Sequence, residues 1–213
     1  QSAYTSDTYS CIKGRGIKLA SDRLKNALKD VDNTTYCLKI DIKKFYNSVD
    51  HDILKSLLRK KIKDKELLWL LDGIIGSADG VPIGNYISQP FANFYLAYFD
   101  HWVKETQGVL NYFRYADDMV FFSGCKKFLH GLLHKIKGYL KDNLALELKT
   151  NYRITPIKCG LDFLGYVFFE NYLKLIKRIK PEWARMPTRN PNMPSIYSYL
   201  GWFCHANTIN LQN

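Results

Sequence analysis

Residues 111–123 read Asn-Tyr-Phe-Arg-Tyr-Ala-Asp-Asp-Met-Val-Phe-Phe-Ser. Two aromatic, β-prone runs, 111–115 and 119–123, are separated by a very short connection, which predicts a β-hairpin. Adjacent carboxylates at such a turn, here Asp117 and Asp118, repel each other and raise at least one pKa unless a cation is close. Hard oxygen ligands suit Mg²⁺, so the pair indicates a magnesium site. Asp-Asp is also ordinary turn chemistry, and an isolated pair would favour that simpler interpretation.

A further carboxylate changes this balance. Asp41 directly follows a short strand predicted at Tyr36–Ile40. An acid at a strand end beside the hairpin pair can complete a cage of three carboxylates. Such a cage can hold two Mg²⁺ ions about 4 Å apart, which activate a 3′-hydroxyl and stabilise a leaving pyrophosphate. The alternative for Asp41 is a helix cap after the strand.

The rest of the chain predicts an α+β fold, an antiparallel sheet with helices packed on one face. Helical periodicity runs from Asp50 to about Gly76, with Asp64 as a cap between two helices. Further elements are expected as a loop at 73–84, a helix from Ser88 to about Lys104, a helix at 128–140, a hairpin formed by 161–169 and 172–176 that turns at Glu170-Asn171, a linker at 181–194 and a helix at 195–212.

Composition favours a polyanionic partner. Lys and Arg number 31 against 20 Asp and Glu, a formal net charge of +11, and aromatic residues make up 15% of the chain. Cations release counterions from phosphates and rings stack on unpaired bases, although a soluble basic protein with a well-filled core fits the same numbers. No apolar run approaches the ~18 residues of a membrane helix, and five scattered cysteines suggest reduced thiols. We therefore expect a cytoplasmic protein that does not associate with a membrane.

Five segments, in order, resemble signatures of bacterial and phage reverse transcriptases. The resemblance covers roughly residues 4–210. It implies a polymerase palm (36–180, with interleaved fingers elements), partial fingers (1–35), and a linker with the start of the thumb (181–213). It also implies an RNA-directed DNA polymerase that extends a DNA or RNA primer with dNTPs on an RNA template. The segments are Tyr9–Gly16, Asp41–Tyr46, Gly80–Gln89, Tyr115–Asp118 and Leu161–Tyr166.

The same resemblance implies the catalytic residues. Asp41, Asp117 and Asp118 would bind two Mg²⁺ ions, for which Mn²⁺ can substitute. The backbone carbonyl of Ile42 would be an additional ligand beside the nucleotide. Lys149 would protonate the pyrophosphate, although a surface lysine is an equally ordinary interpretation.

Further residues would contact the nucleotide or the nucleic acid. Tyr46 would exclude the ribose 2′-hydroxyl, unless it is simply a core tyrosine, and Gly84 would let the backbone approach the nucleotide. Gln89 would lie near the nascent pair, with a surface glutamine as the alternative. Lys13 and Arg15 would reach the triphosphate, unless this basic loop is only solvated. A primer–template track, or alternatively a solvated face, is expected at Lys174, Lys177, Arg178 and Lys180.

The subtype rests on one short pattern. Ile83 stands where many reverse transcriptases carry Gln, and Asn85 with Ser88-Gln89 follows. This pattern is similar to enzymes of diversity-generating retroelements, which implies low fidelity and a basic accessory protein. Group II intron and retron enzymes remain alternatives, as does a non-catalytic RNA-binding scaffold.

Overall fold

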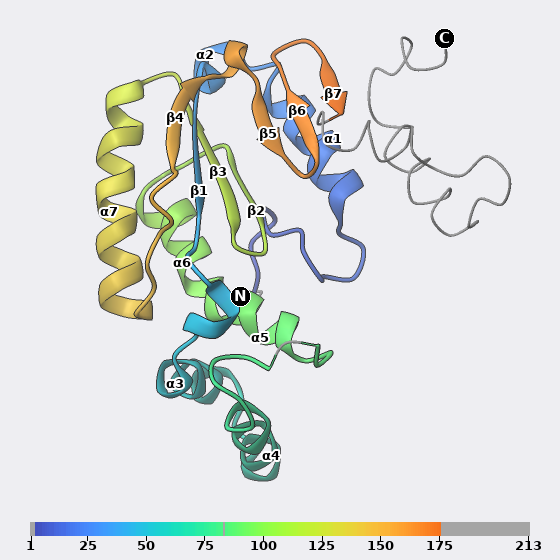
Figure 1. The fold of residues 1–213 in the computed structure, drawn as a ribbon, viewed down its shortest axis with the longest axis vertical. Helices are drawn as coiled ribbons and strands as arrows, with labels where there is room; N and C mark the ends of the chain where they lie inside the picture. Colours follow the sequence, from blue (N-terminus) through green and yellow to red (C-terminus); the bar gives the residue numbers. More distant parts are fainter. Residues whose placement is uncertain (1–2, 83, 176–213) are drawn as a thin grey trace, which may run out of the picture.

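A central sheet of four antiparallel strands, in the order β2-β3-β1-β4, organises the fold. The computed structural model describes residues 3–82 and 84–175, and the predicted α+β fold is confirmed there (Figure 1). In chain order the elements are α1 (Ile17–Ala27), α2 (Val31–Thr34), β1 (Tyr36–Asp41), the 3-10 helix η1 (Phe45–Ser48), α3 (His51–Lys61), α4 (Lys65–Ile75), α5 (Ser88–Tyr95), α6 (Ala97–His101), the π-helix η2 (Trp102–Thr106), β2 (Tyr112–Tyr115), β3 (Asp118–Ser123), α7 (Lys126–Leu144), β4 (Arg153–Pro156), the 3-10 helix η3 (Ile157–Cys159), β5 (Leu161–Phe163), β6 (Tyr166–Phe168) and β7 (Leu173–Leu175).

The two faces of the central sheet belong to different hydrophobic clusters. Successive side chains of a strand point to opposite faces, so Met119 and Phe121 of β3 enter one cluster while Val120 and Phe122 enter the other. Helices α3–α7 contribute to the first cluster, in agreement with the prediction of helices packed on one face. The second face is covered by α1 and the sheet β5-β6-β7, which the sequence analysis did not anticipate (Figure 1).

Local sequence signals account for the starts of α3 and α4. Asp50 accepts a hydrogen bond from the Ile53 amide, and Asp64 accepts bonds from two amides at the start of α4. These caps confirm the predicted pair of helices. Helix α7 is longer at both ends than predicted, and its buried residues recur at the three- and four-residue spacing of an amphipathic helix: Leu129, Leu132, Leu133, Ile136, Leu140 and Leu144.

The helix predicted from Ser88 to about Lys104 is interrupted. Leu96 has a φ of −91° and a ψ of −3°, which separates α5 from α6. The final turn, η2, is a π-helix in which the Gln107 amide donates to the Trp102 carbonyl. A π-turn holds one more residue than an α-turn. Here it accompanies the full burial of Val103.

The predicted run 161–169 was wrong as a single strand. Leu164 and Gly165 both have positive φ, +55° and +82°, and they form a tight turn that divides the run into β5 and β6. The turn predicted at Glu170-Asn171 is present, since the Phe169 amide donates to the Tyr172 carbonyl at 2.9 Å. The elements α1 and β4 were not predicted.

The predictions for the C-terminal part of the chain lie partly outside the described residues. The linker at 181–194 and the helix at 195–212 fall there, as do Lys177, Arg178 and Lys180. Cys11, Cys37, Cys125 and Cys159, all within the described part, are free thiols. None of the described helices is both long and apolar enough to cross a membrane.

Candidate active site

The sheet register brings two of the predicted acids together. Asp41 ends β1, Asp118 begins β3, and the antiparallel register pairs these two residues directly. Tyr115 pairs with Asp118 on the other side, so Ala116 and Asp117 form the two-residue turn between β2 and β3. Ala116 has a φ of +55°, a left-handed conformation that costs a non-glycine residue about 1 kcal/mol. The turn that carries Asp117 is therefore held in a strained backbone conformation.

Burial and mutual repulsion weaken the acidity of the hairpin pair. Burial raises the pKa of Asp117, the charge of Asp41 raises it further, and Lys149 opposes both effects. The pKa of Asp118 is raised to about 6, chiefly by burial, with Lys39 acting against the shift and the two neighbouring acids adding to it. These carboxylates are thus destabilised as anions, a state that a nearby cation would relieve.

Two lysines supply positive charge at the acids. The Nζ of Lys149 donates to Asp41 Oδ2 at 2.8 Å, and its backbone amide donates to the Asp41 carbonyl at 2.8 Å. The hydrogen bond to Asp41 raises the pKa of Lys149. Lys39 lies 3.1 Å from Asp118 Oδ2 and donates to the Asp162 carbonyl of β5 at 2.6 Å. Lys39 was not predicted as a site residue, although its place two residues before Asp41 on one strand puts both side chains on the same face.

Two carboxylate oxygens are suited to a hard cation. Asp118 Oδ1 is buried and has no hydrogen-bond partner among the described residues. Asp41 Oδ1 also lacks a well-aligned hydrogen bond there, although Lys149 Nζ lies 2.8 Å away. Lys149 directs its hydrogen bond to Oδ2, which leaves Oδ1 without an aligned donor. These oxygens fit a divalent ion in chemistry, but no group of three His, Cys, Asp or Glu side chains in the described part converges as a preformed cage.

Tyr46 lies beside the acids on η1. It is half-buried, and burial together with the charge of Asp117 raises the pKa of its hydroxyl. Its carbonyl accepts a hydrogen bond from the Val81 amide at 2.8 Å, which fixes residues 80–81 against η1. Gly80 has a φ of +69°, and a Cβ there would lie 2.3 Å from the Tyr46 carbonyl oxygen. Gly80 is a second residue that the sequence analysis missed.

The other residues predicted to contact the nucleotide have varied surroundings. Ile42 is fully buried and pairs with Leu148 in an isolated bridge. Gly84 has a φ of +92°, and a Cβ there would meet none of the described atoms within 4 Å. Gln89 is exposed and accepts a hydrogen bond from Cys11 Sγ. Ile83 lies outside the described residues.

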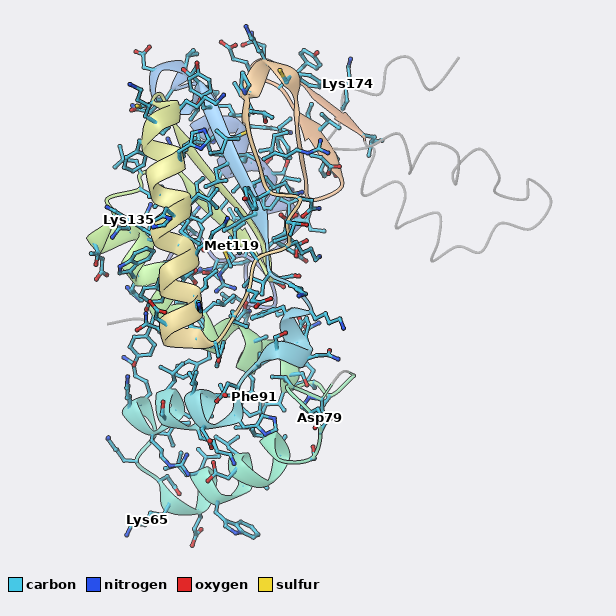
Figure 2. All side chains as sticks on the ribbon, turned by 60° about the vertical axis from the view of Figure 1, so that its left-hand side comes forward. Lys65, Asp79, Phe91, Met119, Lys135 and Lys174 are labelled. Carbon is cyan, nitrogen blue, oxygen red and sulfur yellow. The ribbon has the colours of Figure 1, made fainter. Side chains whose placement is uncertain are left out.

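The predicted basic contacts differ in their surroundings. Lys13 is exposed, whereas Arg15 donates to the carbonyls of Thr5 and Thr8 and so fastens the N-terminal segment. Lys174 lies on β7 at the edge of the second sheet (Figure 2). Its ammonium group sits 5.0 Å from the centre of the Tyr172 ring.

Comparison with known proteins identifies the family of the chain. The family model described as "Reverse transcriptase (RNA-dependent DNA polymerase)" matches residues 2–168. The chain belongs to the reverse transcriptase family. Protein YkfC of Escherichia coli (strain K12) is 23% identical over 205 residues, covering 75% of this chain and 54% of YkfC. The chain thus spans about half the length of that relative.

Solved structures of telomerase share the fold of this reverse transcriptase family member. Telomerase from Candida albicans, in complex with a fragment of telomeric RNA, matches with a TM-score of 0.67 and 11% identity over 94% of this chain and 38% of that chain. Apo telomerase from Candida tropicalis matches with a TM-score of 0.58 and 15% identity over 80% and 37%.

The raised pKa of Asp118 predicts that the free energy of unfolding depends on pH in metal-free buffer. Its folded pKa of about 6 exceeds the ordinary value of 3.8, so the folded chain binds this proton more tightly than the unfolded chain. The resulting stability is fully present below about pH 4 and is lost as the pH rises through about 6. Asp118→Asn should therefore gain about 1–2 kcal/mol relative to the wild type between pH 4 and pH 7, allowing for partial exposure. Urea unfolding with EDTA measures this. Asp142→Asn, an exposed site on α7, is the control, and parallel pH profiles for Asp118→Asn and the wild type would contradict the prediction.

Gly80 and Gly84 make a matched pair for a stability test. Both have positive φ, but only Gly80 lies against the backbone of Tyr46 and Asn47. Gly80→Ala should cost about 2–3 kcal/mol of unfolding free energy, and Gly84→Ala about 1 kcal/mol. Equal losses in urea unfolding would show that the close approach to η1 contributes nothing.

Proposed function

We propose that the chain catalyses RNA-templated DNA synthesis, extending a DNA or RNA primer with dNTPs. The observation that carries the proposal is the pairing of Asp41 with Asp118 beside the Asp117 turn. Membership of the reverse transcriptase family supports the same chemistry. A telomerase of the same fold is in complex with RNA, which supports an RNA template as partner.

Asp41, Asp117 and Asp118 would hold two Mg²⁺ ions, or Mn²⁺ in their place, with the Ile42 carbonyl as a further ligand. When bound, such ions activate a primer 3′-hydroxyl and stabilise the departing pyrophosphate. Lys149 and Lys39 lie against Asp41 and Asp118, so bound ions would share these carboxylates with the two lysines. Lys149, whose Nζ donates to Asp41 Oδ2, would be placed to give a proton to pyrophosphate.

The remaining residues would orient the substrates. Tyr46, held by η1 and the Val81 amide, would exclude a ribose 2′-hydroxyl by shape. A Tyr46→Ala variant that still rejects ribonucleotides would contradict this role. Gly84 would let the backbone approach the nucleotide, and Gln89 would lie near the nascent pair. Lys13 and Arg15 would contact the triphosphate. The primer–template backbone would be contacted by Lys174, Lys177, Arg178 and Lys180. Arg15 would have to exchange its contacts with Thr5 and Thr8 for phosphate.

We further propose that the enzyme belongs to a diversity-generating retroelement. It would act in the cytoplasm of a bacterium, together with a basic accessory protein. The bacterial relative YkfC supports a bacterial origin. The retroelement type rests on the segment Ile83-Gly84-Asn85 with Ser88-Gln89. Group II intron and retron enzymes are the alternatives within the family.

Primer extension on an RNA template with dNTPs and Mg²⁺ tests the activity. Asp117→Asn should reduce extension by more than about a hundredfold, because it removes a charge that metal binding needs. Asp142→Asn should extend like the wild type, since its side chain is exposed on α7. A wild-type chain that binds RNA tightly but extends no primer would instead support a non-catalytic RNA-binding scaffold.

Ile83→Gln tests the retroelement setting. A glutamine amide can form hydrogen bonds that depend on the geometry of the nascent base pair, whereas an isoleucine side chain forms none. Misincorporation opposite template adenine, measured with single dNTPs, should fall by about tenfold in the variant. Ile83→Leu, which stays apolar, should match the wild type, and equal error rates for all three would end the low-fidelity hypothesis.

A further inference from the structure

A fully buried ion pair lies behind the catalytic turn. Arg114 of β2 and Asp100 of α6 both have 0% of their side chains exposed. Arg114 Nε lies 2.8 Å from Asp100 Oδ1, and Nη2 lies 2.6 Å from Oδ2, a two-pronged contact. The hydroxyls of Thr8 and Tyr112 donate to the same carboxylate at 2.8 Å each. Burial lowers the pKa of Arg114, but Asp100 more than compensates, so the arginine stays charged.

The arginine has donors beyond those that Asp100 uses. Its Nη1 donates to the Ala116 carbonyl at 3.0 Å and to Asn93 Oδ1 at 3.1 Å. The Ala116 carbonyl belongs to the peptide that joins Ala116 to Asp117. Ala116 has the left-handed φ of +55°, a conformation that persists only when surrounding contacts impose it. Arg114 therefore contacts the strained peptide immediately before a predicted metal ligand.

The same residue connects this turn to the N-terminal segment. The Tyr9 amide donates to the Arg114 carbonyl at 3.0 Å, and the Arg114 amide donates to the Asp7 carbonyl at 2.9 Å. Arg15 in turn donates to the Thr8 carbonyl at 2.8 Å. Through its backbone and its buried side chain together, Arg114 thus joins β2, α5, α6 and the segment before α1.

We propose that Arg114 is a positioning residue for catalysis: through the Ala116 carbonyl it sets the conformation of the turn, and so the direction of the Asp117 carboxylate. The inference rests on the proposed function, because Asp117 matters as a ligand only there. An ion pair that merely stabilised the fold would need Asp100 and not the contact to the turn. Replacing the pair in a protein that still folds therefore distinguishes a positioning role of Arg114 from a role in stability alone.

The double substitution Arg114→Met with Asp100→Asn makes this separation. Replacing both charges avoids leaving one of them buried alone. Asp100→Asn keeps one carbonyl oxygen as acceptor for the Tyr112 hydroxyl, and its amide group can donate to the Thr8 hydroxyl oxygen, while methionine fills the arginine volume. Mn²⁺ binding, followed by the electron paramagnetic resonance signal of the free ion, should weaken roughly tenfold to a hundredfold. In primer extension, kcat should fall at least about tenfold while the KM for dNTP changes less than about threefold.

Tyr95→Phe is the matched control. It removes a buried hydroxyl that donates to the Leu144 carbonyl at 2.7 Å, away from the turn. It should lower the midpoint of thermal unfolding yet bind Mn²⁺ like the wild type. If the double variant does not fold, Arg114→Lys replaces it, because one ammonium group cannot serve Asp100 and Ala116 together.

The outcomes separate the two hypotheses. A folded Arg114 variant with wild-type Mn²⁺ affinity and kcat overturns the positioning role and leaves the proposed function standing. Equal loss of Mn²⁺ affinity in Tyr95→Phe also overturns it. A wild-type chain that binds Mn²⁺ but extends no primer refutes the proposed function, while the Mn²⁺ titration still tests Arg114. A wild-type chain that binds no Mn²⁺ refutes both.

Discussion

Two carboxylates held opposite each other on neighbouring strands, Asp41 and Asp118, are the constraint on which this structure depends. Like charges at paired positions of a sheet destabilise it, so the fold needs positive charge at that point. Lys149 and Lys39 supply it, one from the segment after α7 and one from β1 itself. The burial that raises the pKa of Asp118 is the same burial that gives a buried cation site its strength.

The lysines also connect the acids to the surrounding elements. Lys149 forms both a side-chain and a backbone hydrogen bond to Asp41, which fastens the chain after α7 alongside β1. Lys39 donates to the Asp162 carbonyl of β5, so the second sheet is connected to the lysine that contacts Asp118. The hairpin of β5 and β6 is thereby linked to Asp118 through one side chain. Movement of that hairpin would change the surroundings of Asp118 directly.

Sequence patterns predicted those parts of the fold in which local chemistry dominates. The hairpin around Asp117 follows from aromatic runs on either side of a short connection, and the α3–α4 pair from the caps Asp50 and Asp64. The strand at 161–169 was misjudged because Leu164, a residue that rarely adopts positive φ, forms a turn there with Gly165. Strand β4 was missed because four residues beside β1 gain their stability from pairing across the sheet and not from composition.

The sequence by itself determined the three acids, their order with the other polymerase-like segments, and the family to which the chain belongs, because those signals are local and lie at fixed spacings. Only the tertiary structure decided which residues surround the acids. Lys39, Gly80 and Arg114 look ordinary in sequence, and each gains its place through a contact with a distant element: the Asp162 carbonyl, the Tyr46 carbonyl and the Asp100 carboxylate. Such contacts depend on how sheets and helices pack, and packing joins residues whose separation along the chain carries no pattern.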